Sequence, residues 1–138
     1  MNMNQNEQTE RICKEKMKGH CCSQAIMSLS LEDLGKENED LIVAMTGFCS
    51  GMGRGEICGS LAGAIAALHV CDTQKATSVW QDEFMDWFCE RFGAYDCRDI
   101  TAGDKERQNG LCLKLILETY FHLQNYIRPS ASPARTAL

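Results

Sequence analysis

Proline is nearly absent from this 138-residue chain, which contains only Pro129 and Pro133. The first 127 residues therefore lack the residue that most strongly interrupts a helix. Hydrophobic residues make up 44% of the chain and charged residues 24%, a composition typical of a folded protein rather than a disordered one. At this length we expect a single helical domain over residues 1–127 and a disordered tail over residues 128–138.

An excess of positive charge is also missing, because 14 Lys and Arg residues face 19 Asp and Glu residues. The net charge of -5 argues against binding to nucleic acid or to an anionic membrane surface. Residues 1–19 contain no apolar run of the signal-peptide type. The longest uncharged stretch, residues 57–71, is shorter than the roughly 20 residues that a membrane-spanning helix needs. We therefore expect a cytoplasmic protein that does not insert into a membrane.

Several catalytic and binding motifs are absent. Gly51, Gly53 and Gly55 alternate every second residue, which matches neither the dinucleotide-binding nor the P-loop pattern. The chain has no G-x-S-x-G sequence, so a serine hydrolase of that type is not indicated. The absence of C-x-x-C excludes the thioredoxin-like motif, the zinc-ribbon motif and c-type haem attachment.

The hydrophobic pattern predicts an all-α fold, a compact bundle of about five helices with a Gly-rich loop. The first helical pattern, over residues 7–34, is interrupted at Gly19-His20, and a short apolar segment follows over residues 41–49. The Gly-rich loop, residues 47–56, leads into a helix over residues 57–70 in which small side chains recur every four residues. Further helices are expected over residues 77–92 and, after a loop over residues 93–104, up to residue 127.

Cysteine is unusually abundant, with nine residues in the chain. In a reducing compartment, thiols are more often metal ligands or redox groups than structural disulfides. Cys22 and Cys58 stand at the predicted starts of helices, where the positive end of the helix dipole favours the thiolate. Thiolates attack disulfides and bind metals, whereas a buried cysteine can also be a small core residue. We expect Cys58, next to Gly59, to be ionised and accessible, and therefore the least replaceable thiol.

An ordered set of motifs runs through residues 18–126. Its parts are Cys22 within residues 19–26, Gly47-Phe48, Cys58-Gly59-Ser60-Leu61-Ala62-Gly63, Phe92-Gly93, Cys97-Arg98-Asp99 and Cys112. This pattern resembles the C_GCAxxG_C_C family of redox-active proteins, which have four spaced cysteines and a C-G-A-x-x-G motif. The resemblance implies that the redox, cofactor-binding and metal-binding residues are Cys22, Cys58, Cys97 and Cys112.

Two positions depart from the family pattern. Ser60 stands where the motif has alanine, and Cys21 places a second thiol directly before Cys22. Cys21 therefore leaves the assignment of the reactive thiol open, because it could replace Cys22 or form a vicinal disulfide with it. The cysteines without family support are expected to be core residues: Cys13, Cys21, Cys49, Cys71 and Cys89.

The sequence also resembles the N-terminal region of split-Soret cytochromes, which implies an iron–sulfur centre. Four cysteines are the ligand count of a [2Fe–2S] cluster, and the same four would satisfy tetrahedral zinc. His20 is the histidine close enough to Cys22 to be a candidate acid–base group or secondary ligand.

Three functions follow from these residues. The first is a redox protein that uses a [2Fe–2S] cluster for electron transfer, or dithiol–disulfide exchange without a cofactor, together with a redox partner protein. The alternatives are a zinc-thiolate structural or sensing module and a non-catalytic helical interaction protein. Self-association into a homo-oligomer stays open.

Overall fold

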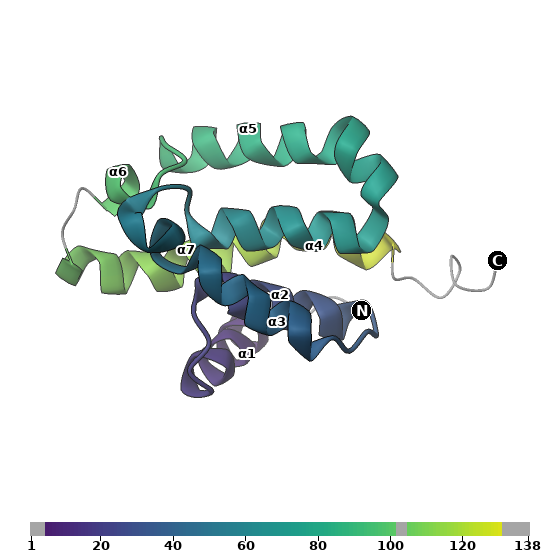
Figure 1. Cartoon of the computed structure of the whole chain (residues 1–138), viewed down its shortest axis with the longest axis horizontal. Coiled ribbons are helices and arrows are strands. Elements are labelled where there is room, and N and C mark those ends of the chain that lie inside the picture. The colour runs from purple at the N-terminus through teal and green to yellow at the C-terminus, as the bar shows by residue number, and fades with distance from the viewer. Residues whose placement is uncertain (1–4, 102–104, 131–138) are drawn as a thin grey trace.

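The computed structural model describes residues 5–101 and 105–130, and this part of the chain is α-helical without a β-strand (Figure 1). The prediction of an all-α fold is confirmed. The elements in chain order are α1 (Gln5–Met17), α2 (Cys22–Asp33), α3 (Glu39–Ala44), the 3-10 helix η1 (Met45–Phe48), the π-helix η2 (Gly51–Gly55), α4 (Gly59–Lys75), the π-helix η3 (Ala76–Trp80), α5 (Gln81–Phe92), α6 (Cys97–Thr101) and α7 (Lys105–Ser130).

The described residues contain seven α-helices, more than the expected five or so. The predicted break at Gly19 separates α1 from α2, and Gly19 has a φ of 87°. The short helix α6 lies where the sequence predicted only a loop. Its five residues are too few to show a helical period in the sequence.

The centre of the fold is formed by α2, α4 and α7, while α5 folds back alongside α4 through η3 (Figure 1). A side chain at Gly63 would lie 2.9 Å from the backbone oxygen of Ser23, so glycine allows α4 to approach α2 closely. The small residues that recur every four positions in α4 therefore have a packing role. The largest fully buried side chains around this contact are Leu61, Leu68, Phe84, Phe88, Ile116, Tyr120, Leu123 and Ile127.

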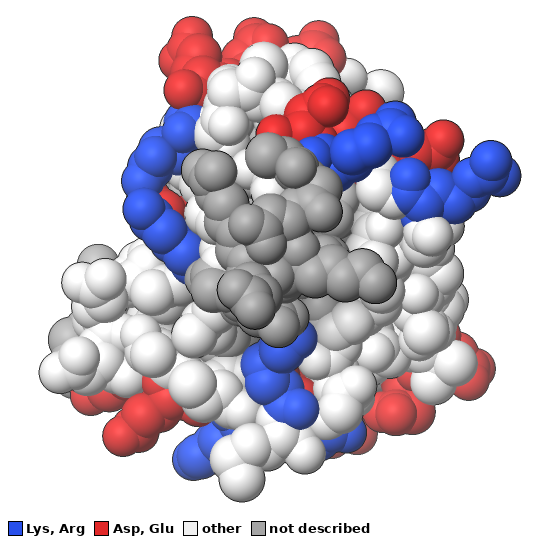
Figure 2. Space-filling view, turned by 90° about the vertical axis from the view of Figure 1, so that its left-hand side faces the viewer, with Lys and Arg blue, Asp and Glu red and all other residues white. Residues whose placement is uncertain are grey.

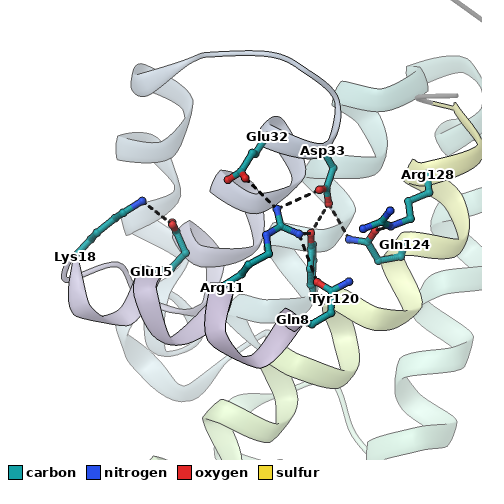
Figure 3. A network of polar contacts seen from close by, with 9 residues as sticks. All are labelled: Gln8, Arg11, Glu15, Lys18, Glu32, Asp33, Tyr120, Gln124 and Arg128. Carbon is teal, nitrogen blue, oxygen red and sulfur yellow. Dashed lines mark hydrogen bonds and ion pairs between the residues drawn. The ribbon is translucent and has the colours of Figure 1, made fainter. Parts of the chain in front are cut away.

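A buried polar network ties α1 to α2 and α7 (Figure 3). The Arg11 guanidinium donates to Tyr120 Oη at 2.7 Å and to Asp33 Oδ1 at 3.1 Å. The other oxygen of Asp33 accepts hydrogen bonds from Tyr120 Oη and from Gln124 Nε2. We refer to Arg11, Asp33, Tyr120 and Gln124 as the Arg11–Asp33 network.

The tail predicted for residues 128–138 lies mostly outside the described residues, from residue 131 on. Residues 128–130 belong to the last turn of α7. None of the helices described combines the length and hydrophobicity needed to cross a membrane.

Candidate functional site

The four cysteines singled out by the family pattern line one cavity of about 250 Å³. They come from four different segments: Cys22 begins α2, Cys58 directly precedes α4, Cys97 begins α6 and Cys112 lies in α7. α6 and the first part of α7 lie at the same end of the molecule, on the left in Figure 1. We call this space the four-cysteine cavity.

A short backbone pairing holds Cys58 beside Cys97. Ile57 and Asp96 form an isolated antiparallel bridge. The Cys58 N–H donates to the Tyr95 carbonyl at 2.8 Å, and the Cys97 N–H donates to the Glu56 carbonyl at 2.7 Å. This pairing joins the Gly-rich segment to α6. Cys58 and Cys97, which are distant in sequence, therefore lie next to each other in the lining of the cavity.

Gly59 brings Cys22 against the start of α4. A side chain at Gly59 would clash with Cys22 Sγ and would lie 2.8 Å from the Phe48 carbonyl oxygen. Any larger residue would push the Cys22 sulfur out of its place. The start of α2 is fixed in turn by Gln24, whose side-chain oxygen accepts from the Cys21 N–H at 3.2 Å.

Cys58 stands at the N-terminus of α4 as predicted, but it is only 4% exposed. Burial raises the pKa of the Cys58 thiol to about 12, although the N–H groups of Leu61 and Ser60 donate to the sulfur and act in the opposite direction. The expectation of an ionised, accessible Cys58 is therefore wrong for the cavity without a ligand. The loss of hydration outweighs the helix N-terminus.

Cys97 and Cys112 are also held in their neutral form. Burial raises the pKa of Cys97 and of Cys112, and the nearby Cys22 adds to both shifts. Lys16 acts in the opposite direction on the pKa of Cys112. Apart from the thiols, Lys16 is the one ionisable side chain among the described residues that line the cavity. Several thiolates can therefore exist together here only with additional positive charge.

The surface around this end carries both signs of charge. Figure 2 faces this end and shows Lys and Arg side chains on several sides of it, with acidic side chains mostly toward the margin.

Cys21 and Cys49 form a disulfide, with their Cα atoms 6.0 Å apart. Cys21 also lines the four-cysteine cavity, and the Ser23 hydroxyl lies 3.4 Å and 3.5 Å from the two sulfurs. The prediction that Cys21 pairs with Cys22 or replaces it is therefore wrong. No local pattern indicates this pairing, because the two cysteines are 28 residues apart and neither belongs to the family pattern.

The remaining cysteines lie elsewhere. Cys13 is exposed, which contradicts the expected core position, whereas Cys71 and Cys89 are partly buried. His20 contacts Glu15 through Nδ1 at 2.9 Å and does not line the cavity. The structure therefore offers no support for His20 as a ligand or acid–base group.

The donor set of the cavity can be compared with the groups that it was expected to bind. Within residues 5–101 and 105–130, no three side chains of His, Cys, Asp or Glu are arranged to hold one metal ion. Tetrahedral zinc needs three or four such ligands around a single ion. A [2Fe–2S] centre needs four cysteines divided between two irons, so only pairs of sulfurs meet at each metal. In number and type, the four cavity thiols match the ligand set of a [2Fe–2S] centre and also that of a four-cysteine zinc site.

A family model described as "Putative redox-active protein (C_GCAxxG_C_C)" matches residues 20–126 of the chain. The match includes Cys22, Cys58, Cys97 and Cys112 and leaves out all of α1. No match to a curated protein or to a solved structure was found.

Proposed function

Because the chain belongs to the C_GCAxxG_C_C family of redox-active proteins, we propose that it is an electron-transfer protein that binds a [2Fe–2S] centre. The ligands in this proposal are Cys22, Cys58, Cys97 and Cys112. The observation that carries it is the presence of these four thiols around one cavity, although they come from four separate segments. The electron donor and acceptor would be partner proteins.

The ionisation of the thiols favours metal binding over thiol exchange at this site. A thiol must be ionised to attack a disulfide, and burial raises the pKa of Cys58, Cys97 and Cys112. A coordinating metal deprotonates a thiol outright, so burial does not prevent coordination. A bound cationic metal would also supply the positive charge that four neighbouring thiolates need.

When bound, the cluster would supply a reversible electron acceptor, and the chain would set its surroundings. The N–H groups of Leu61 and Ser60 that reach Cys58 Sγ would stabilise its thiolate form. The backbone bridge between Ile57 and Asp96 would keep Cys58 and Cys97 at a fixed separation. Lys16 would offset part of the negative charge of the ligands.

Dithiol–disulfide exchange is the second candidate, because the Cys21–Cys49 disulfide shares a cavity with Cys22. In this case an external dithiol would reduce the disulfide. The dithiol would become a disulfide, and its two electrons and two protons would convert Cys21 and Cys49 into thiols.

Metal analysis after anaerobic purification separates these functions. We expect about two irons and two sulfides per chain and visible absorption that bleaches on reduction, as a [2Fe–2S] centre requires. Colourless protein with stoichiometric zinc would instead indicate the zinc-thiolate module. Metal-free protein in which Cys21 and Cys49 cycle reversibly would indicate thiol exchange.

A further inference from the structure

Ser60 carries a buried hydroxyl group for which the described part of the chain provides no hydrogen-bond partner. The residue is 0% exposed, and its Oγ has no hydrogen-bond partner among the described residues. A buried hydroxyl without a partner destabilises the folded state, and such groups often indicate a missing ligand. Ser60 also lines the four-cysteine cavity, so a group bound there is a natural partner.

The position of Ser60 at the start of a helix also favours a bound group with negative charge. It is the second residue of α4, a helix of 17 residues, where the helix dipole favours negative charge. Its backbone N–H already reaches the Cys58 sulfur. The preceding residue, Gly59, has no side chain to separate α4 from Cys22. The end of α4 is therefore suited to a negatively charged sulfur-rich group.

We propose that the Ser60 hydroxyl donates a hydrogen bond to a sulfur of the bound [2Fe–2S] centre and raises its reduction potential. This inference rests on the proposed function. A thiol sulfur is a weak acceptor, whereas a sulfur bound to iron carries more negative charge. Hydrogen bonds to cluster sulfurs are among the factors that set the potential, because they stabilise the more negative, reduced form.

Ser30 provides a matched control within the same fold. It lies in α2, is 1% exposed, and its hydroxyl also has no partner among the described residues. Unlike Ser60, it does not line the four-cysteine cavity. Ser30→Ala therefore removes the same group without touching the proposed site.

The experiment compares Ser60→Ala, Ser30→Ala and the wild type, each as metal-free protein and after reconstitution with iron and sulfide. In the metal-free state, both substitutions should raise the melting temperature, because each removes an unsatisfied buried hydroxyl. After reconstitution, Ser60→Ala should have a more negative midpoint potential than the wild type. It should also gain less in melting temperature on loading. Ser30→Ala should match the wild type in both measurements.

Equal midpoint potentials and equal thermal gains in Ser60→Ala and the wild type would overturn the inference. It would also fail if Ser60→Ala lowered the melting temperature of the metal-free protein while Ser30→Ala raised it, because Ser60 would then have a partner in the fold itself. A wild-type protein that takes up no iron and sulfide would instead refute the proposed function, and this inference with it. Iron analysis of the wild type distinguishes that result from the others.

Discussion

The Arg11–Asp33 network and the four-cysteine cavity are two regions that contain buried polar groups. The polar groups of the network bond to one another, whereas the cavity contains a hydroxyl that has no partner among the described residues. In the network, the Asp33 carboxylate accepts hydrogen bonds from Arg11, Tyr120 and Gln124. In the cavity, burial holds the thiols of Cys58, Cys97 and Cys112 neutral, and the Ser60 hydroxyl has no partner among the described residues. Helix α1 contributes to both regions, Arg11 to the first and Lys16 to the second.

The two regions differ in whether each buried polar group has a hydrogen-bond partner among the described residues. A buried polar group is tolerated when a partner replaces the water that it has lost. The network supplies those partners from within the chain, so its role is to hold α1 against α2 and α7. The cavity leaves its groups incomplete, which is the condition expected of a site that binds something else.

The largest expected effect on stability is in the network. Asp33→Ala leaves Arg11, Tyr120 and Gln124 without their shared acceptor and should lower the free energy of unfolding by about 3 kcal/mol. Arg11 retains an exposed neighbour in Glu32, at 3.5 Å, which limits the loss. Urea unfolding measures the effect. Asp40→Ala, at an exposed position of α3, is the control and should change little. Equal stability of the two variants would show that the network is not structural.

An effect of the same size is expected for the covalent support of the cavity. The Cys21–Cys49 disulfide closes a loop with a sequence separation of 28, and its removal should cost about 3 kcal/mol. The double variant Cys21→Ser/Cys49→Ser should therefore unfold at a lower urea concentration than the oxidised wild type. A dithiol reductant should shift the unfolding midpoint of the wild type but not that of the double variant. An unchanged wild-type midpoint would contradict this role.

A smaller effect tests the neutral state of Cys58. Burial holds its pKa at about 12 in the folded protein, above the value of a thiol in the unfolded chain. As pH rises above about 9, the unfolded chain releases this proton while the folded chain retains it, so stability falls. This thiol contributes a slope of at most about 1.4 kcal/mol per pH unit, which Cys58→Ala should remove.

The measurement is urea unfolding of metal-free protein between pH 8 and about pH 10. Ser30→Ala, which removes a buried hydroxyl outside the cavity, should retain the wild-type slope. If Cys58→Ala shows that same slope, the buried thiol is not held neutral by the fold.

The smallest effect belongs to the charge at the cavity wall. Lys16→Gln removes a positive charge that lowers the pKa of Cys112. Less thiolate should then form near pH 8.5, and alkylation of Cys112 should slow by about twofold to fivefold, since an exposed charge contributes below about 1 kcal/mol. Alkylation followed by peptide mass spectrometry gives the rate. Lys36→Gln, at an exposed position outside the cavity, should leave it unchanged.

The sequence predicted what depends on local pattern. Helical periodicity and the lack of proline gave the all-α fold, and Gly19 marked the break between the first two helices. The ordered family motif selected the four cysteines that line one cavity, without indicating how their segments meet. The bridge between Ile57 and Asp96 depends on tertiary packing and has no local signature.

Long-range partners and burial could not be predicted in the same way. Asp33 and Tyr120 are 87 positions apart, and nothing in their neighbouring residues indicates that they pair. The helix-start position of Cys58 was recognised, but its pKa depends on how much water the surrounding elements remove. A single sequence shows the helix-start position of Cys58 but not how much water the surrounding elements remove.

The most direct test of the account is cluster loading in single cysteine variants. The four variants are Cys22→Ser, Cys58→Ser, Cys97→Ser and Cys112→Ser, with Cys71→Ser as the control because Cys71 is partly buried and does not line the cavity. Iron, sulfide and the visible spectrum are measured after anaerobic purification, with helicity confirming the fold. We predict that the wild type and Cys71→Ser carry the cluster and that each of the four cavity variants loses it or binds it with altered absorption. Undiminished iron and sulfide with an unchanged spectrum in all four cavity variants would contradict the account.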